Sequence, residues 1–225
     1  MNRRAVPDRT GDWPYIGVDY GEACISGKKI KIMFVAMDRG EGEEYSEEQR
    51  FEDYQRVWRE NVINPSNPHM CGAHLIMKEL VREDTKDPSK FANQFALTNS
   101  VKCGHMWSSS TPQMRSNCSN HLLEEIRCLE PNLIITQGSD PAWWVTYRLG
   151  LNSPSIHSFP GGKLKAIEIF ESEERLVLTT PYPAARQVIC SLPSLFEAIQ
   201  KVKDRHPFSI KLPNMGNTCK KTVIL

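Results

Sequence analysis

The chain has 225 residues, of which 40% are hydrophobic and 24% charged, so it can bury one sizeable core without division into two domains. A formal net charge of +1 excludes a strong overall attraction for phosphates, so nucleic-acid binding requires a local basic patch. No segment approaches the roughly 18 consecutive apolar residues of a membrane span, and residues 1–14 lack the apolar core of a secretory signal. We therefore expect a cytoplasmic protein whose seven cysteines are candidates for metal binding or catalysis.

Buried strands and amphipathic helices alternate along the chain. Continuously apolar runs such as residues 29–36 indicate strands buried on both faces of a parallel sheet. Thr111 followed by Pro112, and Ser194 with Glu197, are typical of helix starts. The predicted elements are a strand at 29–36, helices at 46–61 and 71–81, a strand at 94–101, a helix from 112, a strand at 132–136, a helix from 141, a hairpin of 164–170 and 175–180, and a last helix capped by Ser194.

This alternation predicts a three-layer α/β/α fold with a central, mostly parallel sheet in a single domain. We expect the domain at residues 29–203, between an N-terminal extension at 1–28 and a C-terminal tail at 204–225. Trp143 and Trp144, on a helix that packs on the sheet, are expected in the core. Ligands of such sheets bind outside the carboxyl ends of the strands. The loops that this rule selects are 37–40, 99–107 and 181–186.

The middle loop and the segments after it carry a recognisable series of motifs. Residues 97–103 read LTNSVKC, and they are followed by Thr111-Pro112, Cys118 and an apolar strand that begins at Pro131 and ends at Gly138. This series resembles the iron-sulfur branch of the uracil-DNA glycosylase superfamily over roughly residues 29–202. The resemblance implies a monomeric enzyme of DNA repair that flips a deaminated base, expected to be uracil, out of single- or double-stranded DNA and hydrolyses its N-glycosidic bond.

The first and third loops match the catalytic motifs of that superfamily, with departures. In FVAMDRG, Asp38 takes the position of the water-activating Asp or Asn, and Met37 stands where the iron-sulfur branch has Glu. In TPYPAARQ, Tyr182 replaces the His that donates a hydrogen bond to uracil O2, and Arg186 lies beyond it. The resemblance implies catalysis by Asp38 and Tyr182, with Met37 and Arg186 at the substrate. A lone Asp after a strand is also a common loop cap.

Two further positions match residues that bind the base. Asn99 resembles the residue that reads the Watson–Crick edge of uracil, because a side-chain amide offers both a donor and an acceptor. The Pro-Phe platform that stacks on the base is replaced by Pro68-His69. The plainer alternatives are a turn-forming Asn99 and a surface His69.

The cysteines predict a structural metal. Cys103 and Cys118 match cluster ligands of the family in spacing, on a loop and near a helix N-terminus. Because the family's N-terminal C-x-x-C pair is absent, Cys24 and Cys71 are expected to complete a [4Fe-4S] site, with Cys219 as a substitute.

A zinc site is the alternative to the cluster. If only three thiolates converge, His69, His74 or His105 would complete a structural zinc site. Cys128 and Cys190 are expected to be buried structural thiols without a metal.

The function also has an alternative. Met37 and Tyr182, which depart from the catalytic motifs, favour a binding module for a nucleobase or nucleic acid that has lost turnover and keeps its iron-sulfur cluster. A generic nucleotide-binding protein is less well supported, because the sequence lacks a phosphate loop of the G-x-x-x-x-G-K-[ST] type.

Overall fold

The structure is a computed structural model of the chain. It describes residues 14–38, 68–81, 89–102, 111–154, 158–161, 164–181 and 186–205. The predicted helix at 46–61 lies outside these residues. In chain order the elements are β1 (Tyr15–Ile16), β2 (Ala23–Ile25), β3 (Lys28–Ile30), β4 (Ile32–Asp38), α2 (Pro68–Val81), α3 (Ser89–Asn93), β5 (Phe95–Val101), α4 (Pro112–Leu129), β6 (Leu133–Gln137), α5 (Ser139–Arg148), β7 (Ser158–Gly161), β8 (Leu164–Glu171), β9 (Leu176–Thr180) and α6 (Arg186–Asp204).

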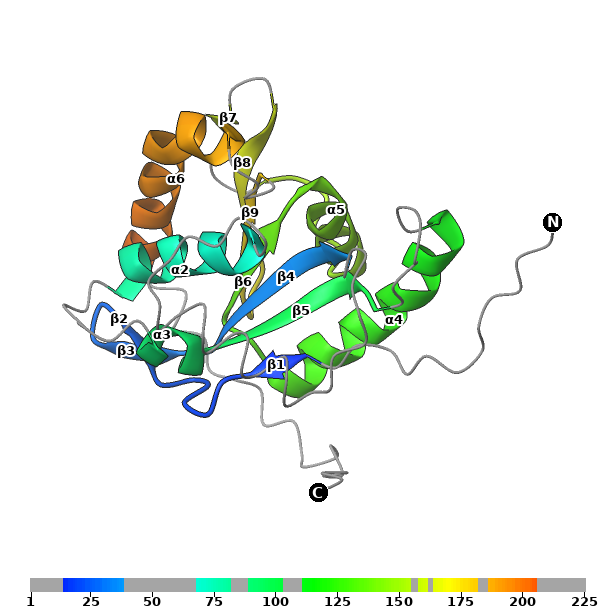
Figure 1. Cartoon of the computed structure of the whole chain (residues 1–225), viewed down its shortest axis with the longest axis horizontal. Coiled ribbons are helices and arrows are strands. Elements are labelled where there is room, and N and C mark those ends of the chain that lie inside the picture. The colour runs from blue at the N-terminus through cyan, green and yellow to red at the C-terminus, as the bar shows by residue number, and fades with distance from the viewer. Residues whose placement is uncertain are drawn as a thin grey trace.

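A sheet of seven described strands forms the centre of the fold, in the order β1-β5-β4-β6-β9-β8-β7 (Figure 1). The four central strands β5, β4, β6 and β9 are parallel to one another. The outer strands β1, β8 and β7 are antiparallel. This arrangement confirms the predicted α/β fold with a mostly parallel central sheet, and β8 and β9 form the predicted hairpin.

Alternate residues of β4 face two separate apolar layers. Ile32, Phe34 and Ala36 belong to one cluster, and Met33 and Val35 belong to the other. Because successive side chains of a strand point to opposite faces, a strand covered by helices on both sides is apolar throughout. The helix residues in the first cluster include Ile76 and Met77 of α2 with Leu195 and Ile199 of α6, and those in the second include Leu122 of α4 with Val145 of α5.

The start of α4 agrees with the sequence. The hydroxyl of Thr111 accepts a hydrogen bond from the backbone N–H of Met114 at 3.2 Å, and Pro112 occupies the first turn, where its missing N–H costs nothing. At the other end, Glu130 adopts a left-handed conformation with φ 48°, and its N–H donates to the carbonyl of Ile126 at 3.0 Å. Both ends of α4 are therefore fixed by local hydrogen bonds.

The start of α6 differs from the sequence prediction. The helix begins at Arg186, and both Pro193 and Ser194 lie inside it, so Ser194 is not its cap. Pro193 directly precedes the predicted cap, but in the structure it is an internal residue that removes one backbone donor from the helix. The apolar side chains after it face the core as expected, because Leu195 and Val202 are 3% and 0% exposed.

Short strands near the amino end were not predicted. Tyr15 of β1 pairs with Leu97 of β5, and its hydroxyl donates to the carbonyl of Ala92 at 3.0 Å. The hairpin of β2 and β3 turns through Ser26 and Gly27, which both have positive φ, as a tight two-residue turn requires. These strands have two or three residues each, which is too short for a periodic pattern to be read in the sequence.

Two predictions of buried side chains were wrong. Trp143 is 55% exposed, whereas Trp144 is half-buried against the core. The buried residues of α5 include Val145, and a side chain two positions away lies on the other side of a helix. The same spacing explains why Cys128, two residues after the buried Ile126, is exposed.

Among the described residues, no helix is long and apolar enough to span a membrane.

Candidate functional site

Four parallel strands end side by side at one edge of the sheet. Asp38 at the end of β4 pairs with Val101 of β5, and Asn99 pairs with Ala36. Gln137, the last residue of β6, pairs with Thr180 of β9. The hydroxyl of Thr180 donates to the carbonyl of Thr136 at 2.7 Å. The first and middle loops thus leave the sheet on neighbouring strands, as the rule for parallel sheets predicts.

His69 reaches this edge from the first turn of α2. Its ring Nδ1 lies 2.9 Å from the side-chain oxygen of Gln137, and the amide nitrogen of Gln137 donates to the His69 carbonyl at 2.9 Å. Gln137 is completely buried. The sequence analysis missed Gln137, although an amide at the end of a strand that begins with three apolar residues was a signal that could have identified it.

Asn99 follows the same alternation as the apolar residues of β5 that face α2. Phe95 and Leu97 belong to the cluster that includes α2, and Asn99 is the next residue in that series. Its side chain is half-buried. The structure therefore brings Asn99 and His69 to the same face of the sheet, at the edge where Asp38 ends β4. The side chains of Asp38 and Arg186 and the whole of Tyr182 lie outside the described parts of the chain.

Met37 connects the ends of three strands. Its carbonyl accepts a hydrogen bond from the hydroxyl of Ser100 in β5 at 2.9 Å. Its side chain lies against Gly138, where an added Cβ would come within 3.1 Å of the Met37 Cγ and 3.2 Å of the Sδ. Gly138 has a φ of +118°, and its N–H donates to the carbonyl of Thr180 at 2.9 Å. Met37 continues the series of Met33 and Val35, so its thioether lies on the face of the sheet opposite Asn99 and offers no proton-transfer group.

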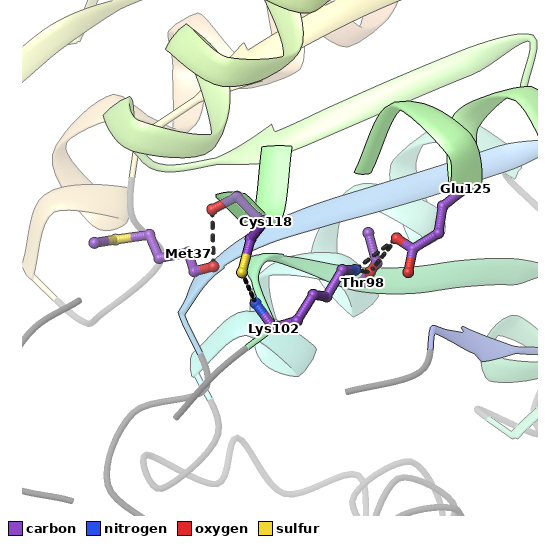
Figure 2. A network of polar contacts seen from close by, with 6 residues as sticks. Met37, Thr98, Lys102, Cys118 and Glu125 are labelled. Atoms are coloured by element: carbon purple, nitrogen blue, oxygen red, sulfur yellow. Dashed lines mark hydrogen bonds and ion pairs between the residues drawn. The ribbon is translucent and has the colours of Figure 1, made fainter. Parts of the chain in front are cut away.

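On the other face of the sheet, a buried polar network joins β5 to α4 (Figure 2). The Lys102 Nζ lies 2.5 Å from Glu125 Oε2, with the two side chains 5% and 16% exposed. Thr98 donates to the same carboxylate at 2.8 Å and accepts a hydrogen bond from Lys102. The charge of Lys102 is paired inside the protein. Lys102 therefore links β5 to α4 and is not part of a surface that binds phosphates.

Cys118 is held by the same segment. Its side chain is 3% exposed, and its Sγ accepts a hydrogen bond from the backbone N–H of Lys102 at 3.3 Å (Figure 2). Hydrogen bonds to sulfur are typical of thiolates that hold iron. Lys102 directly precedes Cys103, which lies outside the described residues together with the side chain of Cys71. The environment of Cys118 therefore fits a metal ligand.

Cys24 lies far from Cys118. It pairs with Lys29 in the β2–β3 hairpin at the amino end of β4, whereas Cys118 contacts the segment beyond the carboxyl end of β5 (Figure 1). The seven residues of β4 between these ends correspond to about 20 Å of extended chain. The structure does not bring these two predicted ligands together.

His74, one of the alternative zinc ligands, packs within the α2 layer. Its ring makes an edge contact with Phe91 of α3 at 5.7 Å between centroids. Burial lowers the pKa of His74, and the nearby cation of Lys78 lowers it further. His74 and Cys118 lie on opposite sides of the sheet, since α2 and α4 pack on different faces. Among the described side chains, no three of His, Cys, Asp and Glu converge on a metal site.

Comparison with known families agrees with this geometry. The family model described as the Uracil DNA glycosylase superfamily matches residues 26–202. The chain therefore belongs to the uracil DNA glycosylase superfamily, which confirms the superfamily prediction. Comparison with curated proteins finds no match. Membership supports a function of the DNA glycosylase type, whereas the iron-sulfur branch stays a prediction.

Proposed function

We propose that the protein is a monomeric DNA glycosylase that flips a deaminated base, uracil, into the carboxyl edge of the sheet and hydrolyses its N-glycosidic bond. The chain belongs to the superfamily, and one observation on its structure carries the proposal. The segments of Asp38, Asn99 and His69, which match three functional positions of these enzymes, meet at that edge from β4, β5 and α2.

The reaction requires few groups. A water molecule gives one proton to the activating group and attacks the sugar C1′ with its oxygen, the C1′–N1 bond breaks with its electron pair leaving on the base, and a proton then neutralises the released base. We assign the water-activating role to Asp38, because Met37 stands in the place of the other carboxylate and cannot take a proton. The departing uracil carries negative charge on O2, which the hydroxyl of Tyr182 would stabilise by donating a hydrogen bond.

Recognition of the base falls to other residues in this proposal. The Asn99 amide can donate to and accept from the Watson–Crick edge of uracil. The His69 ring provides a flat surface for stacking at the start of α2. Arg186, the first residue of α6, would contact the DNA backbone or the base.

We propose a structural [4Fe-4S] cluster held by Cys118, Cys103 and Cys71, with Cys219 in place of Cys24 as the fourth ligand, and zinc is the alternative metal. Bound there, the metal would fix the segment after β5 to α4 without taking part in hydrolysis. The buried Cys118, with the Lys102 N–H on its sulfur, is the observation in favour. Cys24 lies at the opposite end of β4, and its substitution is therefore the control for this site.

The test uses matched oligonucleotides that carry one uracil or one thymine, single-stranded and in a duplex. Wild-type protein is expected to create alkali-sensitive abasic sites in the uracil strand only. Asp38→Ala is expected to lower the rate about 100-fold or more, since positioned acid–base groups contribute at least this much. Asp19→Ala, at an exposed turn near the amino end, is the control and should keep the wild-type rate. A wild-type protein without product would overturn the proposal.

The departures at Met37 and Tyr182 favour one alternative, a binding module without turnover. It predicts saturable binding of uracil-containing DNA at low salt, measured by fluorescence anisotropy, with no abasic product after long incubation. Binding together with product supports the enzyme. The absence of both binding and product excludes both functions.

A further inference from the structure

Gln137 and His69 form a closed pair of hydrogen bonds. The amide nitrogen of Gln137 donates to the backbone carbonyl of His69, and the amide oxygen faces the His69 Nδ1, both at 2.9 Å. Gln137 ends β6, which lies between β4 and β9, and it has no exposed surface. One buried amide thus contacts both the backbone and the ring of a residue at the start of α2.

The chemistry of these groups fixes where the ring carries its proton. A backbone carbonyl only accepts, so the nitrogen of the Gln137 amide must face it. The amide oxygen, which also only accepts, is then directed at Nδ1. His69 therefore donates from Nδ1–H, and in the neutral ring Nε2 is unprotonated. The pair determines both the orientation and the tautomer of the His69 ring.

Two unusual residues are explained together by this contact. His69 stands where the family resemblance places a Phe. Gln137 is an amide in a strand whose five residues are all buried. A Phe ring is held by apolar packing alone, whereas an imidazole also needs a partner for its N–H when it is partly buried. Gln137 supplies that partner from the sheet.

We propose that Gln137 is a positioning residue for base binding, which holds the His69 ring in one plane and one tautomer as a stacking surface for a flipped nucleobase. This proposal rests on the proposed function. It predicts that the loss of Gln137 weakens binding of the base by freeing the ring, and leaves the chemical step unchanged. Immobilised side chains of this kind contribute roughly two- to tenfold to affinity.

The first test measures the tautomer directly and needs no turnover. Long-range ¹⁵N–¹H NMR on histidine-labelled protein is expected to show His69 protonated on Nδ1, with its signals identified among the six histidines by their loss in His69→Phe. In Gln137→Leu the ring is expected to gain the Nε2–H form. An unchanged tautomer in Gln137→Leu, or an Nε2–H form in the wild type, would overturn the proposal.

The second test separates positioning from stability. Gln137→Leu is expected to raise KM, or the Kd for a uracil-containing oligonucleotide, roughly two- to tenfold with kcat within about twofold of the wild type. Restoring an apolar ring in the double variant Gln137→Leu/His69→Phe is expected to recover most of the affinity. An unchanged KM and Kd, or a double variant that binds no better than Gln137→Leu, contradicts the role. A wild type that binds without turnover removes the proposed reaction but leaves the tautomer and Kd tests valid.

Discussion

Lys102 and Glu125 form an ion pair of 2.5 Å that joins the segment after β5 to the carboxyl-terminal half of α4. Both side chains are largely removed from solvent, and Thr98 bonds to the same carboxylate. The pair fixes Lys102 at the point where its backbone N–H contacts the sulfur of Cys118. It therefore holds the backbone group that contacts the candidate metal ligand, on the face of the sheet opposite Asn99 and His69.

Removal of one partner of this pair should be strongly destabilising. Glu125→Gln leaves the Lys102 ammonium buried without its counter-charge, and we expect a loss of about 3–5 kcal/mol in the free energy of unfolding. Urea unfolding at neutral pH measures this loss. The matched control is Glu124→Gln, because Glu124 pairs with Arg127 on the exposed face of α4 and should contribute less than about 1 kcal/mol. Equal losses in the two variants would show that the buried pair has no special role.

Gly138 should not tolerate a side chain. Its φ of +118° is unfavourable for other residues, and a Cβ would come within 3.1 Å of Met37. We expect Gly138→Ala to cost about 3 kcal/mol in unfolding free energy. Gly150→Ala is the control, since Gly150 also has a positive φ but no atom within 4 Å of an added Cβ, and it should cost about 1 kcal/mol. A similar cost at both glycines would contradict the close contact with Met37.

The stability of the protein should depend on pH through His74. Because the pKa of His74 is lowered by burial, the unfolded chain takes up a proton on this residue before the folded protein does. The stabilisation is thus fully present above the ordinary pKa of 6.5 and is lost as the pH falls through it towards the lowered value. We expect wild-type protein to lose more unfolding free energy between pH 7.5 and pH 5.5 than His74→Gln does. An equal loss in His74→Gln and in the wild type would contradict the role of His74.

The metal should depend on Cys118 and not on other cysteines of the described structure. Protein purified without oxygen is expected to contain iron and sulfide, and Cys118→Ser is expected to lose most of both. Cys128→Ser, at an exposed position on the same helix, and Cys24→Ser, at the far end of β4, should keep the wild-type content. A colourless protein that contains zinc would support the alternative metal. A wild-type protein without metal, or a full metal content in Cys118→Ser, would contradict the assignment of Cys118.

The core of the fold was predictable because its signals are local. The strand β4 is apolar at successive positions, since both of its faces are covered. Thr111 with Pro112 indicates the start of α4, because the cap bond involves only residues within one turn of the helix. The start of α6 was not predictable in this way. Ser194 with Glu197 is typical of a helix start, but α6 already begins at Arg186 and continues through both residues.

Part of the candidate site follows from topology and part does not. The rule for parallel sheets places Asp38 and Asn99 on neighbouring strands, as found. The contact between His69 and Gln137 joins residues 68 positions apart, and no local pattern indicates it. The separation of Cys24 from Cys118 also depends on how the β2–β3 hairpin is placed, which cysteine spacing cannot reveal.

The most direct measurement of the central claim is the quantity of free uracil that the wild-type protein releases from uracil-containing DNA, determined by mass spectrometry beside the count of abasic sites. We predict one uracil for each abasic site, with no base released from the thymine control. Asp38→Ala protein should release almost none in the same time. Uracil-containing DNA that is bound by the wild-type protein but yields no free uracil would contradict the account and identify a binding protein.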